Sequence, residues 1–315
     1  MQHLTTLCLL ATMASAAMAD AIMETFTYKT MGDLEIKADV YRADDEAVRP
    51  VVVWIHGGAL IMGGRQDIDR RIKQMMLEEG YVLVSIDYRL APETKLPSII
   101  SDIDDAFQWI RRQGPRLFHA DVGRVAVIGG SAGGYLTLTS GFRVEPRPTV
   151  LVSFYGYGDL VGDWYSTPSP HKRHQGTSMS PAEAAEFENG RPIANARDRS
   201  QGGGPFYQYC RQHGLWPQKV STWDPRAQRE RFVPYMPVHN VDEHYSPTLL
   251  IHGSEDTDVP YDQSNRMKAE LERNKVLHQL IRIENAEHGL RDGDAEEVRK
   301  AYEAVRQFVN RHMKD

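Results

Sequence analysis

Short apolar runs alternate along this chain with longer amphipathic stretches. The runs are rich in β-branched residues and apolar at nearly every position, which is typical of strands that helices cover on both faces. They predict strands at residues 51–55, 81–86, 125–128, 150–154, 248–251 and 279–283. The amphipathic stretches predict helices near residues 67–79, 98–112, 131–142, 263–273 and 295–312. Such an alternation builds right-handed βαβ units, so we expect an α/β fold with a mostly parallel central sheet and helices on both faces.

A different pattern precedes the first of these runs. Leu34, Ile36, Ala38 and Val40 are separated from one another by single polar residues. Strict alternation places the apolar side chains on one face of a strand and the polar ones on the other. We therefore expect an antiparallel edge strand with one buried face.

The alternation of strands and helices stops between about residues 158 and 245. This segment is rich in proline, glycine, arginine and aromatic residues. Long connections in compact domains are more often functional than idle, so we expect an inserted cap here. Within it, residues 180–188 predict a short helix with Ser180 as its N-cap, and residues 206–213 predict another.

Two tryptophans of this insertion, Trp164 and Trp216, are candidate substrate-binding residues. Large aromatic side chains commonly line the pockets that hold apolar parts of a ligand. The alternative is that these side chains only pack the cap against the body of the protein. The sequence leaves both interpretations open.

Composition agrees with one globular domain over residues 20–315. The chain has 315 residues, of which 41% are hydrophobic, enough for a large core. Its net charge is −6 and it has no block of lysine or arginine, so we expect no nucleic-acid partner. No apolar run reaches the roughly 18 residues that a membrane-spanning helix needs. The oligomeric state is not indicated.

Residues 1–19 have features of a signal peptide. They are mostly apolar, and Ala17-Met18-Ala19 before Asp20 has the small-residue form of a cleavage site. This predicts a secreted or periplasmic protein. No lysine or arginine precedes the apolar stretch, so the alternative is a retained N-terminal extension and a cytoplasmic protein. Cys8 would leave with the signal peptide, and Cys210 alone could form no internal disulfide.

The first candidate catalytic motif is Gly129-Gly130-Ser131-Ala132-Gly133, which follows a predicted strand and precedes a predicted helix. A serine at a strand-to-helix turn, with glycines two residues away on both sides, has the pattern of a nucleophile elbow. The turn is sharp and strained, and a side chain at either glycine would collide with the neighbouring backbone. We expect Ser131 to be a nucleophile.

A base and an acid follow later in the chain. Asp256 and His288 each come shortly after a predicted strand, and the order Ser131, Asp256, His288 matches one known order of a catalytic triad. A serine hydroxyl needs an imidazole to take its proton, and the imidazole needs a carboxylate to fix its tautomer. The carboxyl ends of parallel strands meet at one edge of a sheet, which would bring the three residues together. Asp258 is the competing candidate for the acid.

A glycine-rich loop after the first predicted parallel strand completes the set. His56-Gly57-Gly58-Ala59 places backbone N–H groups where no side chain blocks them, as an oxyanion-binding site requires. We expect the donors to be Gly58, Ala59 and Ala132, with Gly57 as the competitor.

Together these motifs resemble the α/β-hydrolase family. The stretches that carry the resemblance are His56 to Ala59, Tyr88-Arg89-Leu90-Ala91-Pro92-Glu93, Gly129 to Gly134 and the Asp256 and His288 segments. Within the family they look closest to the hormone-sensitive-lipase-like esterases. The segment 252–260 is more similar to the prolyl-oligopeptidase and dienelactone-hydrolase branches. The resemblance covers residues 34–157 and 246–312 but not the cap.

The resemblance implies a carboxylic-ester hydrolase that acts on a small-molecule ester, with short acyl chains, through an acyl-enzyme intermediate. It implies no cofactor and no metal, and the histidines of the cap lack zinc-site spacing. Two alternatives stay open. One is a serine peptidase or amidase of the prolyl-oligopeptidase-like branch, and the other is a non-catalytic binding protein on the same fold.

Overall fold

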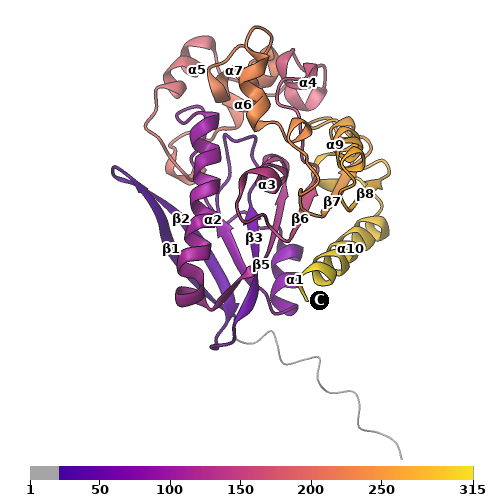
Figure 1. The fold of residues 1–315 in the computed structure, drawn as a ribbon. Helices are drawn as coiled ribbons and strands as arrows, with labels where there is room; N and C mark the ends of the chain where they lie inside the picture. The colour runs from indigo at the N-terminus through magenta and orange to yellow at the C-terminus, as the bar shows by residue number, and fades with distance from the viewer. Residues whose placement is uncertain (1–20, 315) are drawn as a thin grey trace, which may run out of the picture.

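The computed structural model describes residues 21–314 (Figure 1). The predicted signal peptide at residues 1–19, including Cys8, lies outside the described residues. None of the described helices is long and apolar enough to cross a membrane.

An eight-stranded mixed sheet forms the centre of the molecule, with the strand order β1-β2-β4-β3-β5-β6-β7-β8. Strands β1, β2 and β4 pair antiparallel, and every later neighbour pairs parallel. This confirms the expected α/β fold with a mostly parallel sheet. The strands are β1 (Ala21–Met31), β2 (Leu34–Ala43), β3 (Arg49–Ile55), β4 (Val82–Ile86), β5 (Ala120–Gly130), β6 (Val150–Phe154), β7 (Thr248–Gly253) and β8 (His278–Ile283).

The edge of the sheet differs from the sequence-based expectation. Strand β2 is not an edge strand, because β1 covers its outer side through an antiparallel hairpin that pairs Met31 with Leu34. The sequence gave no clear signal for β1, since most of its side chains stay at least partly exposed. Its Phe26 packs against Trp109 at a ring distance of 5.9 Å and so joins β1 to the core.

Helices cover both faces of the sheet (Figure 1). Alternate residues of β3 show the division: Val51 and Val53 belong to the core under α2, α3 and α9, whereas Val52 belongs to the core under α1 and α10. Each central strand therefore needs apolar residues at successive positions. The covering helices are α1 (Arg70–Glu78), α2 (Leu96–Phe118), α3 (Ala132–Arg143), α9 (Asp262–Arg273) and α10 (Ala295–Met313).

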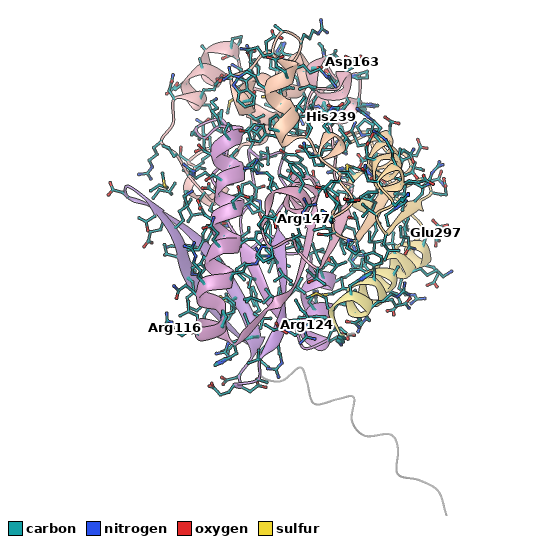
Figure 2. The ribbon with its side chains drawn as sticks, in the orientation of Figure 1. Arg116, Arg124, Arg147, Asp163, His239 and Glu297 are labelled. Atoms are coloured by element: carbon teal, nitrogen blue, oxygen red, sulfur yellow. The ribbon has the colours of Figure 1, made fainter. Side chains whose placement is uncertain are left out.

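We call residues 158–245, which connect β6 to β7, the cap segment. In Figure 1 its helices lie together at one end of the sheet. Figure 2 shows Asp163 and His239 of the cap segment at that end, and Arg116 and Arg124 at the opposite end. The cap segment contains the helices α4 (Asp163–Ser166), α5 (Pro181–Glu188), α6 (Gly204–His213), α7 (Trp216–Ser221) and α8 (Arg229–Phe232), and the 3-10 turns Lys172–His174, Ala196–Asp198, Val233–Tyr235 and Pro237–His239.

Both helices predicted in this segment are present. Ser180 caps α5 and forms a reciprocal capping box with Glu183. Gly214 ends α6 in the left-handed conformation, with φ at 66°.

Candidate active site

Ser131 lies at the turn between β5 and α3, in a backbone conformation that is unfavourable for a residue with a side chain, with φ at 57° and ψ at −123°. The glycines on either side make this turn possible. A Cβ on Gly133 would lie 2.0 Å from the carbonyl oxygen of Ile55, and one on Gly129 would lie 2.4 Å from that of Gly133. The strain is typical of functional positions, and it projects the serine hydroxyl from the sheet edge.

The structure brings Ser131, Asp256 and His288 into one hydrogen-bonded chain. Nδ1 of His288 lies 2.7 Å from Oδ2 of Asp256, and Nε2 lies 3.1 Å from Oγ of Ser131. Asp256 follows β7, and His288 begins the 3-10 turn His288–Leu290 after β8. The neighbouring ends of parallel strands thus position all three side chains, as expected for this sheet edge.

The loop after β7 places the two candidate acids on different sides of His288. Oδ1 of Asp256 accepts hydrogen bonds from the backbone N–H groups of Asp258, at 2.9 Å, and Val259, at 2.8 Å. These bonds hold the Asp256 carboxylate toward Nδ1 of His288. Asp258 lies on the other side of the imidazole, with Oδ2 3.7 Å from Nε2. Asp258 therefore does not contact the nitrogen that an orienting acid must hold.

The pKa shifts of Asp256 and His288 suit proton transfer along the hydrogen-bonded chain. Burial raises the pKa of Asp256, but hydrogen bonds from His252 and His288 and their charges outweigh it and keep the pKa well below the ordinary range. Burial lowers the pKa of His288, but the hydrogen bond to Asp256 and the negative charges of Asp258 and Asp256 outweigh it and raise the pKa. The arrangement therefore favours an ionised acid beside a readily protonated imidazole.

The loop after β3 turns sharply beside Ser131. Gly58 has φ at 107° and Ala59 has φ at 57°, and the turn is closed by bonds from Ile61 and Met62 N–H to the Gly58 carbonyl. A Cβ on Gly58 would lie 2.3 Å from the carbonyl oxygen of Met62. Among the hydrogen bonds of residues 21–314, none uses the N–H of Gly58, Ala59 or Ala132. These three amides are therefore available as donors, and so is that of Gly57, the competing candidate, whose N–H is equally unused among residues 21–314.

A cavity of about 520 Å³ opens over the nucleophile. Its wall combines the loop after β3, which we call the oxyanion loop (residues 56–62) because it contains the proposed oxyanion donors, with aromatic, aliphatic and acidic side chains. Sequence reasoning missed Tyr155, which directly follows β6, and Met62, which lies three residues after Ala59. Tyr207 is one of several aromatic residues of the cap segment, and no sequence signal distinguishes it from the others. Around Ser131 and His288 the cavity is lined by Trp54, Gly57, Gly58, Ala59, Met62, Asp67, Ile68, Asp69, Gly130, Tyr155, Tyr207, Asp258 and Gly289.

The prediction that Trp164 and Trp216 bind substrate is not supported, because neither lines this cavity. Trp216 is fully buried and stacks on Tyr165 at a ring distance of 4.0 Å. Trp164 stacks on Tyr165 at 3.6 Å. Both rings also contact Tyr157, outside the cap segment, at ring distances of 5.2 Å from Trp164 and 6.2 Å from Trp216, which agrees with the alternative that they pack the cap segment against the body. In residues 21–314, no group of three or more His, Cys, Asp or Glu side chains is arranged to hold a metal ion.

A family model described as "alpha/beta hydrolase fold" matches residues 52–291 of this chain. The chain belongs to the α/β-hydrolase family. This confirms the resemblance drawn from the motifs, including the hormone-sensitive-lipase-like group.

Other proteins resemble this α/β-hydrolase in part or in fold. A non-reducing polyketide synthase of Preussia isomera is 29% identical over 314 residues, and the match covers 84% of this chain but 12% of the synthase. A carbohydrate esterase from gut microbiota superposes with a TM-score of 0.66 at 16% identity and covers 93% of this chain and 97% of its own. A butyrate-bound esterase of Thermogutta terrifontis gives 0.65 at 18% identity, covering 91% and 93%. At these identities the two structures show the shared fold.

Proposed function

We propose that this α/β-hydrolase cleaves carboxylic esters with short acyl chains through an acyl-enzyme intermediate on Ser131. The observation that carries the proposal is the hydrogen-bonded chain from Ser131 through His288 to Asp256, which faces a cavity beside three available backbone amides. An acyl-transfer site needs a nucleophile, a base with an orienting acid, and donors for the developing oxyanion.

The reaction follows from these contacts. His288 Nε2 takes the Ser131 proton as Oγ attacks the ester carbonyl, and Asp256 stabilises the imidazolium that forms. The N–H groups of Gly58, Ala59 and Ala132 bind the oxyanion. The imidazolium then protonates the leaving alcohol, which departs as the acyl-enzyme forms. Water activated by His288 attacks the acyl group and releases the acid and Ser131.

Two observations support a short acyl chain. The cavity has a volume of about 520 Å³, within the range of small-ligand sites, and Tyr207 of the cap segment forms part of its wall. The cap segment carries eight arginines, at positions 173, 191, 197, 199, 211, 226, 229 and 231, and lacks the apolar character of a lipid-docking lid. The butyrate-bound esterase of the same fold is consistent with an ester of this size.

The test is a panel of p-nitrophenyl esters from acetyl to decanoyl, measured beside aminoacyl anilides. We expect the highest kcat/KM between acetyl and hexanoyl, and at most weak anilide cleavage. Ser131→Ala should lose roughly 10⁴–10⁶-fold in rate and should not be labelled by a fluorophosphonate, whose fluoride Ser131 Oγ displaces. Ser101→Ala, on α2, is the matched control. Full activity of Ser131→Ala would refute the proposal, and faster cleavage of anilides than of esters would favour the peptidase alternative.

A further inference from the structure

Asp258 is a buried carboxylate that faces His288 from the side opposite Asp256. Only 7% of the residue is exposed, and it lines the same cavity as Ser131 and His288. Its Oδ2 lies 3.7 Å from Nε2 of His288, the nitrogen that contacts Ser131. The imidazole is therefore flanked by two carboxylates, one near each ring nitrogen.

Asp258 is held in place by donors from the cap segment. Its Oδ1 lies 2.5 Å from the hydroxyl of Tyr207, 3.0 Å from Nε2 of His174 and 3.2 Å from Nη1 of Arg211. Its Oδ2 pairs with Nη2 of Arg173 at 3.2 Å. Because several donors share one carboxylate, the position of its charge is fixed.

These donors come from two separate parts of the cap segment. Arg173 and His174 lie in the turn Lys172–His174, whereas Tyr207 and Arg211 lie one helical turn apart on α6. Arg173 also pairs with Glu287, the residue before His288, at 2.5 Å. The loop after β7 and the loop after β8 are therefore both connected to the cap segment beside the imidazole.

The proton on His174 can be assigned from its surroundings. Burial lowers the pKa of His174 despite its hydrogen bond to Asp258, which favours the neutral ring. The hydroxyl of Ser169 lies 2.7 Å from Nδ1 and can donate to it, which leaves the ring proton on Nε2. His174 then donates this proton to Asp258 as a neutral group, so the cations paired with this carboxylate are Arg173 and Arg211.

We infer that Asp258 is a positioning residue that links the cap segment to the general base and holds a second negative charge beside Nε2 of His288. The charge stabilises the imidazolium that forms whenever His288 takes a proton. Arg173 opposes it, since its guanidinium lies near the same ring. This inference rests on the proposed function only in taking His288 as the base.

Both negatively and positively charged groups lie around the imidazole of His288. Asp256 and Asp258 face its two nitrogens, and Glu287 accepts the backbone N–H of His288. Arg173 pairs with both Asp258 and Glu287, and Arg211 pairs with Asp258. Burial raises the pKa of Asp258, but the His174 hydrogen bond and the charges of His288, Arg173 and Arg211 outweigh it and keep the carboxyl ionised. The Tyr155 ring packs against His288 at 4.8 Å without a charge.

The test is a titration of His288 by histidine-selective NMR in the full chain, with the His288 signal assigned from its absence in His288→Gln. Asp258→Asn keeps the shape of the side chain and removes its charge, so the pKa of His288 should fall by about one pH unit. Arg173→Gln should shift the pKa in the opposite direction. Two neighbours with opposite effects distinguish an electrostatic role from general disturbance of the fold.

Asp159→Asn is the matched control, because Asp159 is buried and paired with Arg266 at 2.6 Å but has no contact with His288. It should leave the pKa of His288 unchanged. An unchanged or higher pKa in Asp258→Asn, or equal shifts in Asp258→Asn and Arg173→Gln, would overturn the inference. The titration needs no substrate, so a protein that cleaves no ester would refute the proposed function and still report on Asp258.

Discussion

The indole N–H of Trp216 donates a hydrogen bond of 2.9 Å to the carbonyl oxygen of Ala59. Trp216 belongs to the cap segment, and Ala59 is a proposed oxyanion donor with φ at 57°. This bond holds a residue in a backbone conformation that L side chains rarely adopt. Trp216 thus stabilises the loop that contains Ala59 through this hydrogen bond, although Trp216 itself does not line the cavity.

Trp216→Phe should therefore lower kcat more than it changes acyl preference. The phenyl ring can still stack on Tyr165 but cannot donate a hydrogen bond to the carbonyl oxygen of Ala59. The N–H of Ala59 would then be less well oriented toward the oxyanion. The loss should be smaller than the roughly 10²–10³-fold that removal of one oxyanion donor costs. Steady-state kinetics on acetyl and hexanoyl esters measure both effects. A large change in the ratio between the two esters would show that Trp216 contacts the acyl chain.

The two carboxylates beside His288 should differ strongly in their effect on rate. Asp256→Asn should reduce kcat by roughly 10³-fold or more, because the amide cannot fix the imidazole tautomer through Nδ1. Asp258→Asn should cost much less, since its carboxylate faces the other nitrogen at 3.7 Å. Rates of the two variants on one ester decide the matter, and the reverse order would identify Asp258 as the orienting acid.

The pH profile of kcat/KM should reflect the raised pKa of His288. The base acts when neutral, so activity should fall as the pH drops through this pKa. Since the hydrogen bond to Asp256 and the charges of Asp258 and Asp256 outweigh burial, the midpoint of this acid limb should lie above 6.5, the ordinary value for histidine. A midpoint below 6.5 would mean that burial dominates.

Gly58→Ala should impair the oxyanion loop. The added methyl carbon would lie 2.3 Å from the carbonyl oxygen of Met62, and the φ of 107° is unfavourable for alanine. The loop must move, so kcat should fall by roughly 10²–10³-fold. Gly202→Ala is the control, because its Cβ would meet nothing within 4 Å. Wild-type kinetics in Gly58→Ala would show that the loop can relax without loss of its donors.

A buried ion pair between the cap segment and the body should contribute to stability. Arg199 pairs with Glu93 at 2.5 Å, and the two side chains are 5% and 4% exposed. Arg199 also donates to the carbonyl of Ala91 at 2.7 Å. Glu93→Gln leaves a buried cation partly unpaired and should lower the free energy of unfolding by about 3–5 kcal/mol. Chemical denaturation measures the free energy of unfolding, and the control variant Glu296→Gln, in the exposed pair with Arg299, should change it far less.

The central strands and covering helices could be predicted closely from the sequence, because burial on both faces requires uninterrupted apolar runs. Strand β1 could not, since its half-exposed residues carry no strong periodicity. Strands β1 and β2 are joined by a tight hairpin around Gly32, with φ at 59°, and only their pairing reveals that β1 lies outermost.

For the site, local motifs predicted where Ser131 and the glycine loop would lie because their backbone geometry is encoded within a few residues. The choice between Asp256 and Asp258 depends on the direction of two backbone N–H groups in the loop, which composition does not specify. The roles of Trp164 and Trp216 depend on contacts with distant segments. An aromatic residue in an insertion has the same sequence signature whether it lines a cavity or fills a core.

The cap segment leaves the sheet at the end of β6 and returns at β7, and these two strands are hydrogen-bonded neighbours that pair Leu151 with Thr248. Because the two strands are parallel, the chain leaves at the carboxyl end of β6, at Phe154, and re-enters at the amino end of β7, at Thr248, so the sheet fixes both attachment points whatever the length of chain between them. We therefore expect a foreign insert grafted at the same junction to leave the strand order unchanged. To function, the graft would have to reproduce the anchoring cations, with a guanidinium at Glu93 and others at Asp258 and Glu287.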